Sequence, residues 1–300
     1  MESMDFGQLL TAMVTPFNHN EEIDFEKTTR LVHFLTDNGT DSIVVSGTTG
    51  ESATLSTDEK LALFEHVVKA AKGRGGVIAG TGNNNTKASI ELTKEAERLG
   101  VDGIMLVAPY YNRPNQDGLY EHFKAIAEST ALPVMVYNIP SRSSVNIEVE
   151  TIVKLSQIDN IVSVKEASGD LDQMSKIIEN TREDFQLYSG DDSMTLPVLA
   201  IGGSGVVSVA SHVIGNEMQQ MINTFKQGDY TKAASIHRKM LPVVKALFSQ
   251  PSPTPLKAVL ALQGLDTGTL RLPLVPVDEE HTREIEKTIE KFKQSMASIR

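Results

Sequence analysis

The sequence contains no cysteine. It can therefore form no disulfide, supplies no thiolate ligand to a metal and has no thiol nucleophile. It also lacks an apolar run of about 18 residues, so no transmembrane helix is expected. No basic segment followed by an apolar one precedes Leu9, and we expect a protein without a secretory signal that works in the cytoplasm.

Basic residues are in the minority. The chain has 28 Lys and Arg residues against 39 Asp and Glu residues, and its formal net charge is −11. This charge repels a phosphate backbone, so nucleic acid is not an expected partner, and an anionic substrate would need a local cation. The seven histidines are scattered along the chain, which disfavours a metal-dependent aldolase. We predict neither a metal nor a cofactor.

Apolar residues make up 40% of the chain, which is sufficient for one large core. Eight short apolar runs alternate with helical stretches and recur roughly every 20 to 34 residues, near the length of one strand-plus-helix unit. They span residues 10–14, 43–46, 77–80, 103–108, 134–137, 161–165, 185–189 and 206–209. This alternation favours a closed (β/α)8 TIM barrel, with an open doubly wound sheet as the alternative.

The intervening helices have their own start signals. Ser56 and Glu59 have the spacing of a capping box, so a helix is predicted to begin there. A second helix begins at residue 86, and its predicted apolar face includes Ile90 and Leu99. Further helices are predicted over residues 117–130, 147–156 and 170–180.

After residue 209 the pattern is helical only. The predicted helices span residues 217–226, 230–248, 255–263 and 279–296. The first of these should close the barrel. We therefore divide the chain into a barrel, residues 1–226, and a C-terminal helical extension, residues 227–300, which we expect to serve packing and subunit association.

The sixth apolar run ends in a lysine, Lys165, at the end of the strand where barrel enzymes carry out their chemistry. Lysine attacks a carbonyl only when neutral, and burial lowers its pKa from about 10.4. Side chains alternate along a strand, so Glu166 should point away from Lys165 and towards the helices. Tyr137 ends the adjacent strand, and its phenol can both give and take a proton.

Three segments of the chain could bind anions. Glycines in residues 47–50 would let the amides and hydroxyls of Thr48 and Thr49 face a carboxylate, although an ordinary turn would look the same. Arg142, just past the fifth strand, could clamp a second carboxylate. The glycine-rich run 202–205 resembles a phosphate loop, but it precedes a strand, so a tight turn is predicted there.

Together, five segments resemble the dihydrodipicolinate synthase (4-hydroxy-tetrahydrodipicolinate synthase) family of the pyruvate-dependent class I lyase superfamily. The segments are residues 47–52 (GTTGES), 109–114 (PYYNRP), 137–142 (YNIPSR), 164–167 (VKEA) and 189–192 (SGDD). The resemblance covers almost the whole chain. It implies a Schiff-base-forming lyase that condenses pyruvate with L-aspartate-4-semialdehyde in diaminopimelate and lysine biosynthesis, as a homodimer or homotetramer without a cofactor.

The resemblance also assigns roles to particular residues. Lys165 would form the Schiff base with pyruvate. Thr48 and Thr49 would hold the pyruvate carboxylate. Tyr137 would relay protons through Thr48 to Tyr111, a residue that a neighbouring subunit contributes in this family.

Three further residues would bind substrate. Arg142 would bind the carboxylate of the semialdehyde, while Gly190 and Val207 would line the pyruvate pocket. The alternatives are N-acetylneuraminate lyase or another pyruvate-dependent class I aldolase, a non-catalytic barrel that binds a keto acid, and a pyridoxal-phosphate barrel.

The sequence departs from the resemblance at the site where feedback-inhibited members bind lysine. Those members carry a histidine or other polar residue near Thr57 and Lys60 and a glutamate near Ala88. Here an incoming lysine would meet another cation and find no carboxylate at residue 88. We therefore predict weak or no inhibition by lysine.

Overall fold

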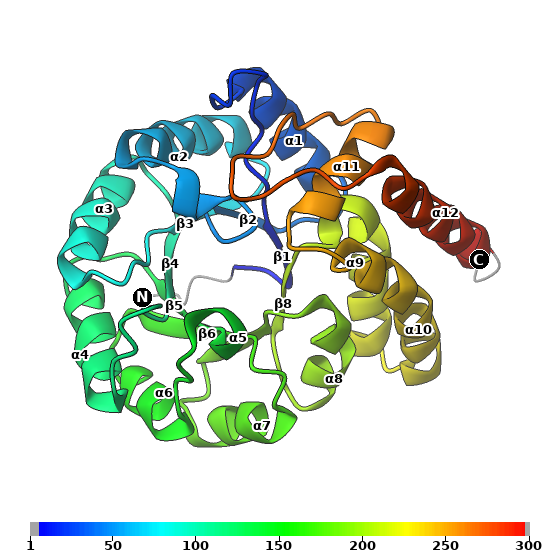
Figure 1. Cartoon of the computed structure of the whole chain (residues 1–300). Coiled ribbons are helices and arrows are strands. Elements are labelled where there is room, and N and C mark those ends of the chain that lie inside the picture. Colours follow the sequence, from blue (N-terminus) through cyan, green and yellow to red (C-terminus); the bar gives the residue numbers. More distant parts are fainter. Residues whose placement is uncertain (1–5, 298–300) are drawn as a thin grey trace.

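The computed structural model describes residues 6–297. Eight parallel strands pair in chain order, and β8 pairs with β1, so the sheet closes into a barrel surrounded by helices (Figure 1). The strands are β1 Leu9–Ala12, β2 Ser42–Val45, β3 Gly76–Gly80, β4 Gly103–Val107, β5 Val134–Asn138, β6 Ile161–Glu166, β7 Gln186–Ser189 and β8 Gly205–Ser208. The predicted TIM barrel is confirmed, and closure excludes the open doubly wound sheet.

Helices follow each strand on the outside of the barrel. They are α1 Phe25–Asp37, α2 Thr57–Ala71, α3 Thr86–Arg98, α4 Gln116–Ala127, α5 Pro140–Ser143, α6 Val149–Leu155, α7 Leu171–Asn180, α8 Thr195–Ala200 and α9 Ser211–Lys226, with short 3-10 helices η1 Ser52–Thr54 and η2 Asp192–Met194. The capping box at the start of α2 is confirmed, with Glu59 N 3.2 Å from Ser56 Oγ and Ser56 N 2.8 Å from Glu59 Oε2.

One helix prediction needs correction. α9 begins at Ser211, six residues before the predicted start. Its first turn buries the polar Ser211 and His212, so the hydrophobic pattern alone misses that turn. In α3, Ile90 and the adjoining Leu99 pack against the larger core, as predicted, beside the buried residues Ser89, Leu92, Thr93 and Ala96.

The barrel has two apolar cores. The larger core lies between the strands and the surrounding helices. The smaller one fills the lumen and contains Phe6, Leu10, Ala12, Val44, Ile78, Met105, Met135, Tyr137, Ile139, Tyr188 and Val207. Filling the lumen with apolar side chains keeps water out of the barrel interior below the carboxyl ends of the strands.

The C-terminal helices α10 Tyr230–Leu247, α11 Thr254–Leu262 and α12 Glu279–Met296 gather on one side of the ring, beside α9 (Figure 1). Only three residues separate the end of α9 at Lys226 from the start of α10 at Tyr230. The division into a barrel, residues 1–226, and an extension, residues 227–300, stays a prediction.

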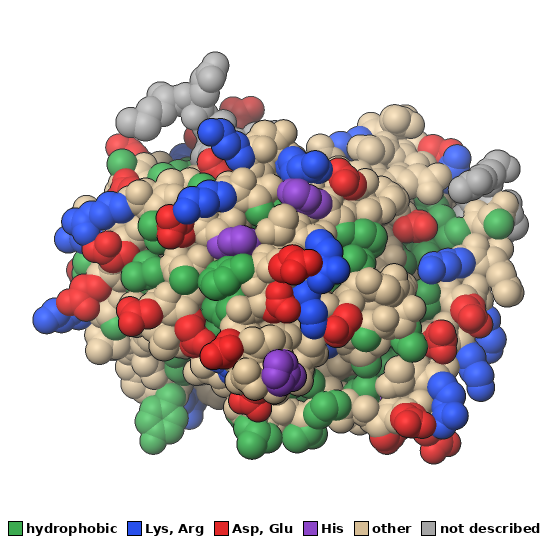
Figure 2. All heavy atoms as spheres, turned by 90° about the horizontal axis from the view of Figure 1, so that it is seen from above, with side chains coloured by type: hydrophobic (Ala, Val, Ile, Leu, Met, Phe, Trp, Pro, Cys, Tyr) green, Lys and Arg blue, Asp and Glu red, His purple; other side chains and the backbone are tan. Residues whose placement is uncertain are grey.

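The surface carries both charges. On the face seen from above, Lys and Arg side chains are interspersed with Asp and Glu side chains (Figure 2). Within residues 6–297, every helix is too short or too polar to cross a bilayer.

Candidate active site

Lys165 is buried at the carboxyl end of β6, and its side chain points into the lumen. Its Nζ lies 4.0 Å from the centre of the Tyr137 ring, and the side chain is 6% exposed. Among residues 6–297, it forms no hydrogen bond or ion pair with a carboxylate. Burial is therefore the largest influence on the Lys165 amine, and it lowers the pKa of this group to about 7. A large share of the amine is neutral at physiological pH.

Tyr137 stands opposite Lys165 because β5 and β6 pair with these two residues in register. Burial raises the pKa of the Tyr137 phenol to about 12, against the opposing effects of Arg142 and of a hydrogen bond with the Thr48 side chain. The phenol is therefore protonated at neutral pH and linked to Thr48. The prediction that Tyr137 is the neighbour of Lys165 is confirmed.

Two charges of opposite sign act on Lys165. The carboxylate of Asp192, the first residue of η2, raises the pKa of Lys165, and the guanidinium of Arg142 in α5 lowers it, both less than burial does. Asp192 is buried and accepts hydrogen bonds from the Ser208 hydroxyl and, at 3.2 Å, from the amide of Val209. Burial also raises the pKa of Asp192. Arg142 is exposed and free to meet a ligand.

The turn after β2 carries Thr48 and Thr49. Non-glycine residues with positive φ stand on both sides of it, Ser46 at +57° and Glu51 at +55°. The side chain of Thr49 is buried and that of Thr48 is exposed, where it reaches Tyr137. The turn thus brings at least Thr48 to the Lys165–Tyr137 pair.

Gly190 lies directly beside Lys165. A Cβ added to Gly190 would lie 3.1 Å from Lys165 Cε and 2.7 Å from Ala167 Cβ, so a larger residue would crowd the amine. Val207, 1% exposed, belongs to the apolar group in the lumen. That these two residues line a pyruvate pocket stays a prediction.

Tyr111 is not part of this group within one chain. It adopts a positive φ of +72° in the loop after β4, and its side chain is 91% exposed. Among residues 6–297, no hydrogen bond joins Tyr111 to Thr48 or Tyr137. The predicted role of Tyr111 therefore depends on a second subunit.

Glu166 points outwards, as predicted. Its carboxylate accepts hydrogen bonds from Asn138 Nδ2 at 3.0 Å, from Gln173 Nε2 at 3.0 Å and from the amide of Ser168 at 2.7 Å. Gln173 belongs to α7, so the bond joins β6 to the helix layer. The next pair in the β5–β6 register, Asn138 and Glu166, thus fixes the two strand ends that carry Tyr137 and Lys165.

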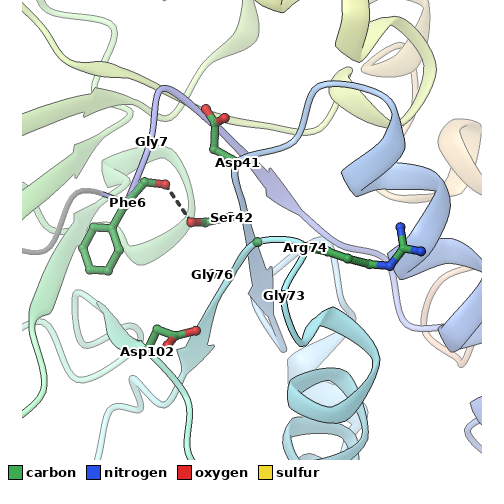
Figure 3. Close-up of a pocket in the computed structure, with 9 residues that line it drawn as sticks. Phe6, Gly7, Asp41, Ser42, Gly73, Arg74, Gly76 and Asp102 are labelled. Carbon is green, nitrogen blue, oxygen red and sulfur yellow. Dashed lines mark hydrogen bonds between the residues drawn. The ribbon is translucent and has the colours of Figure 1, made fainter.

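A cavity lies at the opposite end of the barrel from Lys165. It measures about 530 Å³ and is lined by Phe6, Asp41, Ser42, Arg74 and Asp102, among others (Figure 3). Its carboxylates bind backbone amides: Asp41 Oδ2 accepts from Leu9 at 2.9 Å, and Asp102 Oδ2 accepts from Val77 at 2.8 Å. These acids stabilise the amino ends of strands, where barrels do not carry their chemistry.

The remaining candidate sites are structural. The run 202–205 forms a turn before β8, in which Gly202 has a φ of +101°, so the prediction of a tight turn is confirmed. In the part of the chain that the structure describes, no three His, Cys, Asp or Glu side chains are grouped as metal ligands.

Residues 5–292 match the model of the Dihydrodipicolinate synthetase family. The chain belongs to this family. It is 61% identical over 286 residues to 4-hydroxy-tetrahydrodipicolinate synthase 1 of Halalkalibacterium halodurans, covering 95% of this chain and 97% of the relative. It is also 56% identical over 287 residues to the synthase of Bacillus subtilis, covering 95% of this chain and 99% of the relative.

Solved structures agree with this assignment. A crystal structure of dihydrodipicolinate synthase from Bacillus anthracis superposes with a TM-score of 0.94 at 58% identity, covering 96% of this chain and 98% of that chain. The family and the lyase function predicted from the sequence are confirmed, and the synthase is favoured over N-acetylneuraminate lyase.

Two charged groups near the site were given no role from the sequence. Asp192 lies in segment 189–192 of the resemblance, and its place just after β7 is a signal for the working face. Lys257, a lone lysine among apolar residues of α11, binds Glu51 beside the Thr48–Thr49 turn. A lysine on the apolar face of a helix was the available signal.

Proposed function

We propose that this barrel condenses pyruvate with L-aspartate-4-semialdehyde, and that Lys165 is the amine that captures pyruvate. The observation that carries the proposal is a buried lysine, 4.0 Å from the ring of a tyrosine, that pairs with no carboxylate among residues 6–297. Family membership supports both substrates. Because burial lowers the pKa of Lys165 to about 7, no separate base is needed to make it a nucleophile.

The chemistry begins with attack of the neutral Lys165 nitrogen on the ketone carbon of pyruvate. Loss of water gives an imine, and loss of a methyl proton converts the imine into an enamine. The enamine carbon attacks the aldehyde carbon of the semialdehyde, whose oxygen takes up a proton. The amine of the semialdehyde then attacks the imine carbon, closes the ring and releases Lys165 as an amine.

Several residues would assist these steps. We assign proton transfer to Tyr137, which is protonated at neutral pH and hydrogen-bonded to Thr48. The amides and hydroxyls of Thr48 and Thr49 would bind the pyruvate carboxylate. Arg142 is exposed and so can pair with the carboxylate of the semialdehyde.

Gly190 and Val207 would shape the pocket around pyruvate. A side chain at residue 190 would crowd Lys165 Cε, and the need for glycine beside the amine supports this role. The exposed Tyr111 would complete the proton relay from a second copy of the chain, so the proposal includes a homodimer or homotetramer. It also includes the cytoplasmic location predicted from the sequence.

Borohydride trapping tests the proposal. Incubation with pyruvate and borohydride should leave a reduced adduct on the peptide that bears Lys165. Lys165→Ala should show no adduct, while Lys69→Ala, at an exposed lysine of α2, should label as the unaltered protein does. Absence of an adduct on correctly folded protein would instead favour a non-catalytic barrel that binds a keto acid.

A second measurement addresses the acceptor. Turnover of pyruvate with aspartate-semialdehyde should exceed turnover with N-acetylmannosamine by several orders of magnitude, because Arg142 would pair with a carboxylate that the sugar lacks. Preference for the sugar would contradict the assignment. An absorption scan without a visible band would separately contradict the pyridoxal-phosphate alternative.

A further inference from the structure

The Thr48–Thr49 turn ends in an unfavourable backbone conformation. Glu51 has a φ of +55°, which glutamate rarely adopts without support from its surroundings. Its amide donates to the carbonyl of Thr48 at 3.1 Å, so the conformation of Glu51 is tied directly to the residue that contacts Tyr137. Something must hold Glu51 in place.

The support comes from the C-terminal extension, more than 200 residues away in the sequence. Glu51 Oε1 lies 2.7 Å from Lys257 Nζ of α11, and Glu51 Oε2 accepts a hydrogen bond from the Arg271 amide at 3.0 Å. The side chains of Lys257 and Glu51 are 3% and 1% exposed. Two buried charges are stable only when paired, so each strongly constrains the position of the other.

The cation is itself fixed by the barrel and by the connector that follows α11. Lys257 Nζ donates to the carbonyl of Thr269 at 2.7 Å and lies 4.4 Å from the centre of the Phe17 ring. The amide of Phe17 in turn bonds to the carbonyl of Thr267 at 3.0 Å. Gly268 passes so close to Phe17 that a Cβ there would overlap its carbonyl oxygen, so the connector is held firmly against the loop after β1.

Other ion pairs attach the same connector without reaching the turn. Lys27 pairs with Asp266 at 2.7 Å, but Asp266 is 62% exposed. Arg271 pairs with Glu59 at the start of α2, beyond η1. Of the three ion pairs, only the buried Lys257–Glu51 pair includes the residue that closes the Thr48–Thr49 turn.

We propose that the Lys257–Glu51 ion pair is a positioning device for pyruvate binding, through which the C-terminal helices hold Thr48 and Thr49 in the conformation that receives the carboxylate. This inference rests on the proposed function of that turn. Neither Lys257 nor Glu51 touches substrate. Loss of the pair should therefore affect pyruvate binding more than the chemical steps.

Steady-state kinetics with Glu51→Gln test this inference. Glutamine keeps the size of the side chain and can still accept from the Arg271 amide, but it removes the ion pair. We expect the KM for pyruvate to rise on the order of tenfold to a hundredfold, with a smaller change in kcat. Asp266→Asn, which breaks the exposed pair on the same connector, should leave the KM unchanged.

A double variant separates positioning from stability. Lys257→Met combined with Glu51→Gln leaves no unpaired buried charge and should fold, yet its KM for pyruvate should remain raised. An unchanged KM in any folded variant of the pair, whatever its melting temperature, would overturn the inference. If the unaltered protein forms no borohydride adduct, the proposed function fails instead, so the two failures are distinguishable.

Discussion

Two buried lysines with similar surroundings face different partners. Lys165 is 6% exposed with its Nζ 4.0 Å from the ring of Tyr137, and Lys257 is 4% exposed with its Nζ 4.4 Å from the ring of Phe17. Burial lowers the pKa of both, to about 7 and about 8. Lys257 binds the carboxylate of Glu51 directly, whereas Lys165 forms no ion pair within residues 6–297.

Burial alone therefore does not make a lysine a nucleophile. The ion pair with Glu51 raises the pKa of Lys257 against the effect of burial and holds its ammonium group in place. The neighbour of Lys165 is a phenol that can exchange protons, whereas Phe17 offers none. The carboxylate 2.7 Å from Lys257 Nζ distinguishes this structural lysine from Lys165, the proposed nucleophile.

The largest expected loss of activity comes from replacing the tyrosine beside Lys165. Tyr137→Phe would place a phenylalanine ring beside Lys165, as Phe17 lies beside Lys257. Turnover should fall roughly 10²-fold to 10⁴-fold, because the proton relay through Thr48 is lost. Rapid-quench trapping with borohydride should still detect adduct on Lys165. Turnover within a factor of two of the unaltered protein would show that the phenol has no role in proton transfer.

The same substitution at the two lysines should have opposite effects on stability. Lys257→Met leaves Glu51 buried and unpaired, so the free energy of unfolding should fall by about 3 to 5 kcal/mol. Lys165→Met removes an amine whose pKa is depressed by burial, so the free energy of unfolding at pH 7 should rise by about 1 to 3 kcal/mol. Urea unfolding measures both. A loss of stability in both variants would contradict the contrast between them.

Tyr111 tests whether the proton path of Lys165 continues into a second subunit. Tyr111→Phe should lower kcat roughly 10-fold to 100-fold with little change in the KM for pyruvate, because only proton transfer is affected. Tyr110→Phe, at the neighbouring and partly exposed tyrosine, is the matched control. Equal losses in kcat and in pyruvate affinity would indicate that Tyr111 only supports the subunit interface.

The two lysines should also give opposite pH dependences. Adduct formation requires neutral Lys165, so its rate should fall about tenfold per pH unit below about 7. The ion pair with Glu51 requires charged Lys257, so pyruvate affinity should weaken as the pH rises above about 8. Lys257→Arg, which stays charged, should retain pyruvate affinity at high pH. A rate of adduct formation independent of pH between 6 and 8 would contradict the role of burial at Lys165.

The smallest effect is expected from added lysine. Lys60 of α2 is a partly buried cation whose pKa is lowered by burial, and residue 88 at the start of α3 is alanine. An incoming lysine would therefore meet a positive charge without a carboxylate partner. Initial rates should change little at millimolar lysine, and half-inhibition at micromolar lysine would contradict this prediction.

The sequence predicted the barrel and the neighbouring positions of Tyr137 and Lys165, because both depend on local patterns. Apolar runs of strand length placed all eight strands. Adjacent parallel strands end at the same edge of the sheet, so Tyr137 and Lys165 were predicted to lie side by side. Alternation along the strand also predicted that Glu166 points outwards.

Local patterns fail where polar groups are buried by distant partners. The first turn of α9 buries the polar Ser211 and His212, so the predicted helix begins six residues too late. Asp192 acts on Lys165 only because the ends of β7 and β8 converge around its carboxylate.

The amino-acid sequence by itself determined the order of strands and helices and the lysine and tyrosine that face each other in the lumen, because period and register follow from neighbouring residues. Only the tertiary structure decided that Lys257, and not Lys165, has a carboxylate as its direct partner. Glu51 and Lys257 are brought to 2.7 Å by the docking of the C-terminal helices. Residues 51 and 257 are far apart in the sequence, so no local sequence pattern predicts their contact, which depends on how the whole chain packs.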